Sequence, residues 1–139
     1  LYVIQDIDLF IRKLEEHADR VIVVMYQAPP QSQIYPLWEM VHGVQRLPLP
    51  SLPELLEVLN QLEIKPDVQV IHTGGSRGFD SFALARDQIA RRLYVYEGTP
   101  EMELLGPILS EVLEETDGVV TIIDSIPLEP HVVSWRPKG

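Results

Sequence analysis

The side chains best suited to bind or transform a small molecule lie between Arg20 and Gly43. There an apolar run, Val21 to Tyr26, leads into a loop that contains Gln27, Trp38 and His42. Aromatic and amide side chains bind flat or apolar molecules by stacking and hydrogen bonding. Trp38 and His42 are four residues apart, so on a helix they share one face, where His42 can serve as a base or a substrate contact. The alternative is that both side chains only pack.

These side chains are predicted to follow a buried strand. Val21 to Tyr26 contains six β-prone apolar residues, a pattern typical of strands buried on both faces. Such strands belong to parallel sheets covered by helices, and ligands bind beyond their carboxyl ends. Leu1 to Ile4 is predicted to end another strand, and apolar spacing from Ile7 to Ala18 predicts a helix capped by Asp6 or Asp8. The first 26 residues therefore form a predicted βαβ unit.

The same signals place the other elements of a single α/β domain, residues 1–139. Pro36 to His42 is a short predicted helix ended by Gly43, and Ser51 with Glu54 forms a capping box for the next helix. Later helices are expected at Phe82 to Leu93 and from Pro100 to about Glu115, bent or split at Pro107, and strands at Val68 to Ile71, Val119 to Ile123 and His131 to Trp135. The loop between the last two strands permits an antiparallel return, and the sheet is predicted to be mixed.

Composition limits the classes of function. The chain has 11 basic and 21 acidic residues, and its net charge of −10 disfavours binding to nucleic acid. It has no cysteine, and the spacing of its four histidines matches no metal-binding motif, so no metal site is expected. No apolar run reaches the roughly 18 residues of a membrane helix, which predicts a cytoplasmic protein without membrane contact.

A glycine-rich segment, Gly74 to Gly78, contains Arg77 and precedes a predicted helix. Backbone N–H groups in such a loop can cradle a phosphate. The spacing matches neither a P-loop nor a dinucleotide fingerprint, so an ordinary surface loop is the simpler interpretation.

The order of elements resembles the second half of a class I S-adenosylmethionine-dependent methyltransferase. The resemblance covers essentially the whole chain, through the segments DRVIVVMYQ, PLWEMVHG, LPSLPELLEVLNQLEIKPDVQVI, RGFDSFALARDQIARRLYV and HVVSWRP. It implies a Rossmann-like three-layer mixed sheet whose last strand is antiparallel. Leu1 to Ile4, Val21 to Tyr26, Val68 to Ile71 and His131 to Trp135 are then similar to the family's strands four to seven.

The resemblance also implies a site. Gln5, Asp6 and Ile7 occupy positions that in the family approach the methyl group of the cofactor or the substrate, and His42 or Asp6 is the candidate catalytic base. The candidate acceptor-binding residues, which follow the strand similar to strand five, are Tyr26, Gln27, Trp38 and His42.

The family's glycine-rich cofactor turn and its ribose-binding acidic residue are missing from the sequence. We therefore expect the chain to be the C-terminal part of an enzyme that binds S-adenosylmethionine and a small-molecule acceptor, inactive in isolation. The alternative is a non-catalytic α/β module that binds a ligand or a partner. In either case an open sheet edge could support a homodimer.

Overall fold

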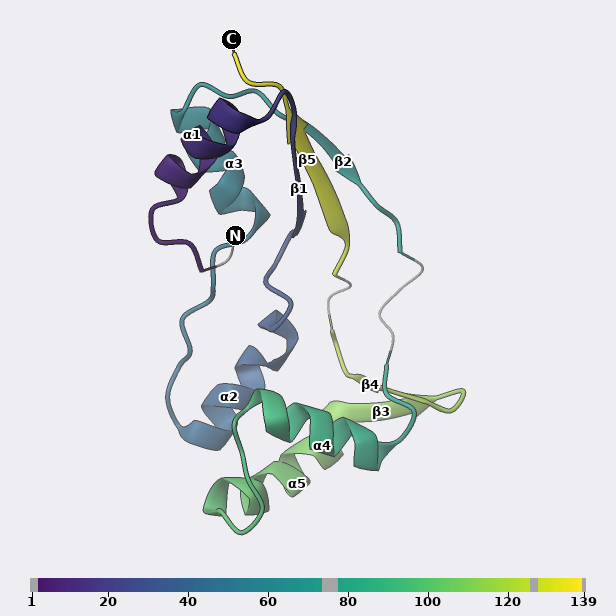
Figure 1. Ribbon diagram of the computed structural model, residues 1–139. Coiled ribbons are helices and arrows are strands. Elements are labelled where there is room, and N and C mark those ends of the chain that lie inside the picture. The colour runs from purple at the N-terminus through teal and green to yellow at the C-terminus, as the bar shows by residue number, and fades with distance from the viewer. Residues whose placement is uncertain (1–2, 74–77, 126–127, 139) are drawn as a thin grey trace. The chain divides into compact units, whose positions relative to one another are not determined.

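A computed structural model describes residues 3–73, 78–125 and 128–138. The chain folds into two compact units (Figure 1). The first unit consists of Leu1–Pro30, Leu49–Gly75 and Leu128–Gly139, and the second of Gln31–Pro48 and Ser76–Pro127. The class is mixed α/β, with helices and small antiparallel sheets.

The first unit is built on a three-stranded sheet. Its strands are β1 (Val21–Tyr26), β2 (Asp67–Val70) and β5 (Pro130–Trp135), in the order β1-β5-β2. β5 is antiparallel to both neighbours, so β1 and β2 run in the same direction. The prediction of a strand over residues 21–26 is confirmed. The antiparallel return that the loop before β5 permits does not occur, because β5 lies between β1 and β2 and the preceding strand pairs elsewhere.

Two helices pack against one face of this sheet, α1 (Ile7–His17) and α3 (Leu52–Gln61). Their apolar residues form a core with the inward side chains of the strands; its buried members are Ile11, Val21, Met25, Leu52, Leu55, Leu59, Ile64, Val133 and Trp135. On the other face of β1, Ile22 and Val24 are 60% and 58% exposed. The prediction that β1 is buried on both faces is therefore wrong for the chain as described, because helices α1 and α3 cover only one of them.

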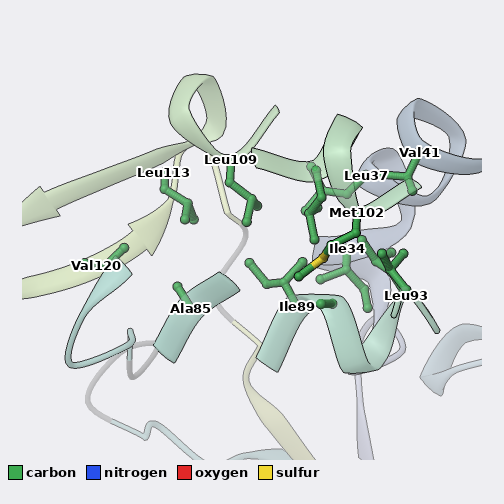
Figure 2. Packing of buried hydrophobic residues seen from close by; sticks show 13 residues of the cluster. Ile34, Leu37, Val41, Ala85, Ile89, Leu93, Met102, Leu109, Leu113 and Val120 are labelled. Atoms are coloured by element: carbon green, nitrogen blue, oxygen red, sulfur yellow. The ribbon is translucent and has the colours of Figure 1, made fainter. Parts of the chain in front are cut away.

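The second unit is mainly helical. It contains a short 3₁₀ helix at Ser32–Ile34, then α2 (Tyr35–His42), α4 (Phe82–Arg92) and α5 (Pro100–Val112). Figure 2 shows apolar side chains of these helices meeting in one core. Its buried members are Ile34, Leu37, Val41, Ala85, Ile89, Ala90, Leu93, Val95, Met102, Leu105, Leu109, Leu113 and Val120.

A β-hairpin completes the second unit. Its strands are β3 (Leu113–Thr116) and β4 (Val119–Ile122), joined at Asp117 and Gly118, both of which have positive φ. An Asp-Gly pair favours this kind of tight turn because both residues adopt left-handed conformations readily. The predicted continuation of the α5 helix to Glu115 is wrong, since the chain turns into β3 after Val112.

Several local predictions are confirmed. Gly43 ends α2 with φ of +69°, and the Ser51 N–H donates to the Glu54 carboxylate at 2.7 Å in the predicted capping box.

Other local predictions are not confirmed. Pro107 lies inside α5 and does not split the helix. Of the strand predicted over residues 1–4, the first two residues lie outside the described ranges, and Val3 and Ile4 are not in a strand. In the described part of the chain no helix is both long and apolar enough to cross a membrane.

Candidate functional site

The carboxyl ends of β1 and β2 lie at the same edge of the sheet. Tyr26 is opposite Pro130 and Val70 is opposite His131, so the start of β5 lies between the two strand ends. Directly beyond β1, the Gln27 carbonyl accepts a hydrogen bond of 3.0 Å from the Ser51 hydroxyl. Two of the predicted acceptor-binding residues, Tyr26 and Gln27, are therefore located at the edge of the sheet where β1 and β2 both end.

The predicted cofactor-side residues precede α1. Asp6 occupies the N-cap position, but its carboxylate makes no capping hydrogen bond. The backbone carbonyl of Asp6 instead accepts from the Phe10 N–H at 3.1 Å. Ile7 packs against the core of the first unit, whereas Gln5 is exposed. The Asp6 carboxylate therefore does not cap α1 by a hydrogen bond, which was the alternative role for this residue.

A histidine–carboxylate pair at the same sheet edge was not among the predicted site residues. His72 Nδ1 lies 3.0 Å from Glu129 Oε1, and the His72 side chain is 82% exposed. His131 Nδ1 lies 3.0 Å from the Glu129 carbonyl oxygen. Because these oxygens only accept, Nδ1 is the donor in each neutral ring and Nε2 holds the lone pair. The position of His72 just after a predicted strand was the available signal.

Trp38 and His42 lie together in the second unit. The centroids of their rings are 4.2 Å apart, as the four-residue spacing on α2 predicts. His42 Nε2 is 2.8 Å from the Leu93 carbonyl oxygen, so Nε2 donates and only Nδ1 can accept a proton. This bond holds the ring of His42 in place beside Trp38. His42 can therefore act as a base only through Nδ1.

Further aromatic groups surround Trp38. The Tyr94 ring meets Trp38 edge-on, with centroids 6.3 Å apart. The Arg46 guanidinium carbon lies 4.5 Å from the Trp38 centroid and 5.8 Å from that of Tyr35. Nothing in the described ranges hydrogen-bonds the buried Tyr35 hydroxyl. We call Tyr35, Trp38, His42 and Tyr94 the aromatic cluster.

The second unit also contains a pocket of about 300 Å³. The α4 helix contributes Leu84, Gln88 and Arg92 to one wall, at the four-residue spacing of a helical face. Other walls come from the hairpin and from residues 78–80. A methyl group at Gly78 would overlap the Val120 carbonyl oxygen, so only glycine allows the paired backbones of residues 79 and 120 to approach.

The predicted site residues are divided between the two units. Gln5, Asp6, Ile7, Tyr26 and Gln27 belong to the first unit, whereas Trp38 and His42 belong to the second. Among the described residues no group of three or more His, Asp or Glu side chains could hold a metal ion. Most of the glycine-rich segment Gly74 to Gly78 lies outside the described residues.

Comparison with known proteins identifies no relative: no family model, no curated protein and no solved structure matches the chain.

Proposed function

We propose that the chain is the substrate-side portion of a S-adenosylmethionine-dependent methyltransferase that acts on a small molecule. The observation that carries this proposal is the direction of the strands. β1 and β2 are parallel to each other, and the last strand, β5, is antiparallel to both. An antiparallel last strand is the feature that the resemblance to class I methyltransferases implies, and a simple antiparallel meander would not place that strand between two strands that run parallel to each other.

The uncovered side of β1 gives independent support. Within the described residues β1 pairs only with β5, so its other edge is free. That edge strand contains no charge and no proline, the residues that usually protect an exposed edge, and Ile22 and Val24 project from its uncovered face. A further parallel strand and a second helical layer would cover both features, as in a three-layer Rossmann-like sheet.

The residues of this chain do not suffice to hold the cofactor. Gln5, Asp6 and Ile7 could line one side of it, but the sequence has no glycine-rich turn of the family's type after a first strand. In the proposal this chain therefore binds the acceptor and removes its proton. Within the first unit, Tyr26 and Gln27 lie where an acceptor would bind, and the candidate base is the Asp6 carboxylate. Within the second unit, the candidate base is His42 Nδ1.

The test is a calorimetric titration of the complete gene product with S-adenosylmethionine. We expect saturable binding by the complete product and none by residues 1–139 alone. Asp6→Asn should weaken binding in the complete product, whereas Asp8→Asn, one residue into α1, should not. Absence of binding by the complete product would rule out the methyltransferase assignment.

The unprotected edge of β1 also favours a second candidate, a non-catalytic module that binds a partner or a second copy through this edge. Under that alternative the complete product binds no S-adenosylmethionine, and Val24→Lys, at an exposed position of β1, abolishes self-association in sedimentation velocity. Residual self-association of Val24→Lys at the wild-type level would exclude pairing through β1.

A further inference from the structure

The Arg46 guanidinium is held by aromatic rings rather than by a carboxylate. It lies 4.5 Å from the Trp38 centroid and 5.8 Å from the Tyr35 centroid. Both distances are within the roughly 6 Å over which a cation is attracted to the negative face of a ring. Arg46 makes no ion pair with any carboxylate of the described ranges. In the described part of the chain, the contacts of this cation are therefore with ring faces.

A hydrogen bond of His42 anchors the aromatic cluster. His42, whose ring is 4.2 Å from that of Trp38, is anchored by its bond to the Leu93 carbonyl. Tyr94 follows directly and has φ of +55°, because it is the left-handed residue of the cap that ends α4, in which the Val95 N–H donates to the Ala90 carbonyl at 2.9 Å. Tyr94 is 61% exposed, so its ring packs on Trp38 at the surface.

Arg46 is the most easily displaced member of this arrangement. It follows Gly43, the end of α2, in a stretch without helix or strand that continues to Pro50. Its backbone is therefore not held by a hydrogen-bonded ladder, whereas Tyr35, Trp38 and His42 all lie on α2. If Arg46 moved away, the faces of Trp38 and Tyr35 would offer a site for another cation.

We propose that the aromatic cluster is a binding site for an organic cation, an alkylammonium or guanidinium compound, and that Arg46 occupies this site in the free protein. The net charge of −10 favours a cationic ligand over an anionic one. Ammonium groups bind in aromatic cages of this composition through the ring quadrupoles. The inference goes beyond the proposed function and does not depend on it.

A cation and Arg46 would compete for the same rings. The apparent affinity for the ligand is then reduced by the fraction of molecules in which Arg46 is bound. Removal of the Arg46 side chain should therefore strengthen binding. The gain should exceed the gain from removing one positive charge elsewhere on the surface. A merely structural Arg46 predicts the opposite, since its loss would loosen the rings.

The experiment is a titration of the 139-residue chain with choline, followed through the indole N–H signal of Trp38 in ¹H–¹⁵N spectra. The neutral isostere 3,3-dimethylbutan-1-ol, at the same concentration and ionic strength, is the matched probe. We expect choline to shift the Trp38 signal and the isostere to leave it unchanged. Trp135, which is buried in the first unit, gives an internal reference signal.

Variants complete the test. Arg46→Ala should tighten choline binding by about 2- to 10-fold, and Tyr94→Leu should weaken it by a similar factor. Arg91→Ala, an exposed arginine on α4, makes the same charge change away from Arg46 and serves as the control. Equal shifts with the isostere, or weaker binding by Arg46→Ala, would overturn the inference, and neither result depends on S-adenosylmethionine binding.

Discussion

The two units differ in how completely they bury their apolar residues. In the second unit, helices α2, α4 and α5 and the hairpin enclose a core in which Ile89, Leu93 and Leu105 are fully buried (Figure 2). In the first unit, α1 and α3 cover one sheet face, and Ile22 and Val24 remain exposed on the other. The difference indicates that the second unit contains its own core, whereas the sheet of the first unit is suited to a further layer.

The largest effect is expected in the enclosed core. Leu105→Ala removes a side chain with no exposed surface, and we expect the free energy of unfolding to fall by about 3 kcal/mol. The neighbouring substitution Leu104→Ala, at a half-exposed position of the same helix, should change it by less than about 0.5 kcal/mol. Urea denaturation followed by circular dichroism measures both. Equal losses for the two variants would contradict an enclosed core around α5.

The covered side of the first unit depends on the start of α3. The Ser51 hydroxyl lies 3.0 Å from the Gln27 carbonyl and 3.1 Å from Glu54 Oε2, and its single proton serves one acceptor at a time. Ser51→Ala should lower the free energy of unfolding by about 1 kcal/mol, through loss of the cap and of the link to β1. Leu104→Ala again serves as a control away from this cap. An unchanged stability would show that Ser51 does not secure α3.

The same cap predicts a dependence on pH. The hydrogen bond from the Ser51 backbone N–H lowers the pKa of Glu54 below its ordinary value of 4.5. A carboxyl group with a lowered folded-state pKa stabilises the fold above its unfolded pKa, and this contribution is lost as the pH falls through the folded value. Wild type should therefore lose more stability than Glu54→Gln when the pH falls from about 5 to 3. Parallel pH profiles for the two proteins would exclude this contribution from Glu54.

Local signals predicted much of this fold, and pairing between distant segments was harder to predict. The apolar run of β1, the capping residues Ser51 and Glu54, and Gly43 act within a few residues, so the sequence alone located them. The helix was predicted to reach about Glu115 because Leu113, one residue past its end, continues the apolar helical spacing. The Asp-Gly turn at residues 117 and 118 was an available local signal for the hairpin that was missed.

In the candidate site too, contacts within one helix were predictable and contacts between distant segments were not. The contact between Trp38 and His42 follows from helical spacing, and the structure contains it. The bond from His42 to Leu93 and the packing of Tyr94 on Trp38 join residues about fifty positions apart, which no periodicity indicates. Similarly, the pairing of His72 with Glu129 depends on the insertion of β5 beside β2.

The smallest effect is expected on the uncovered sheet face. Val24→Thr exchanges a methyl group for a hydroxyl at a position 58% exposed, so the hydroxyl remains hydrated and the free energy of unfolding should change by less than about 0.5 kcal/mol. The same substitution at fully buried Val133 should cost about 1 to 3 kcal/mol, because the hydroxyl loses its water.

Comparison of these two variants in the complete gene product tests what covers the face. If another layer packs on Ile22 and Val24, Val24→Thr should become nearly as costly there as Val133→Thr, while in residues 1–139 it stays nearly neutral. An equally small cost in both proteins would mean that β1 keeps this face in water, which would remove one of the two supports for the three-layer sheet. A large cost in residues 1–139 alone would instead mean that the two sheet faces do not differ as described.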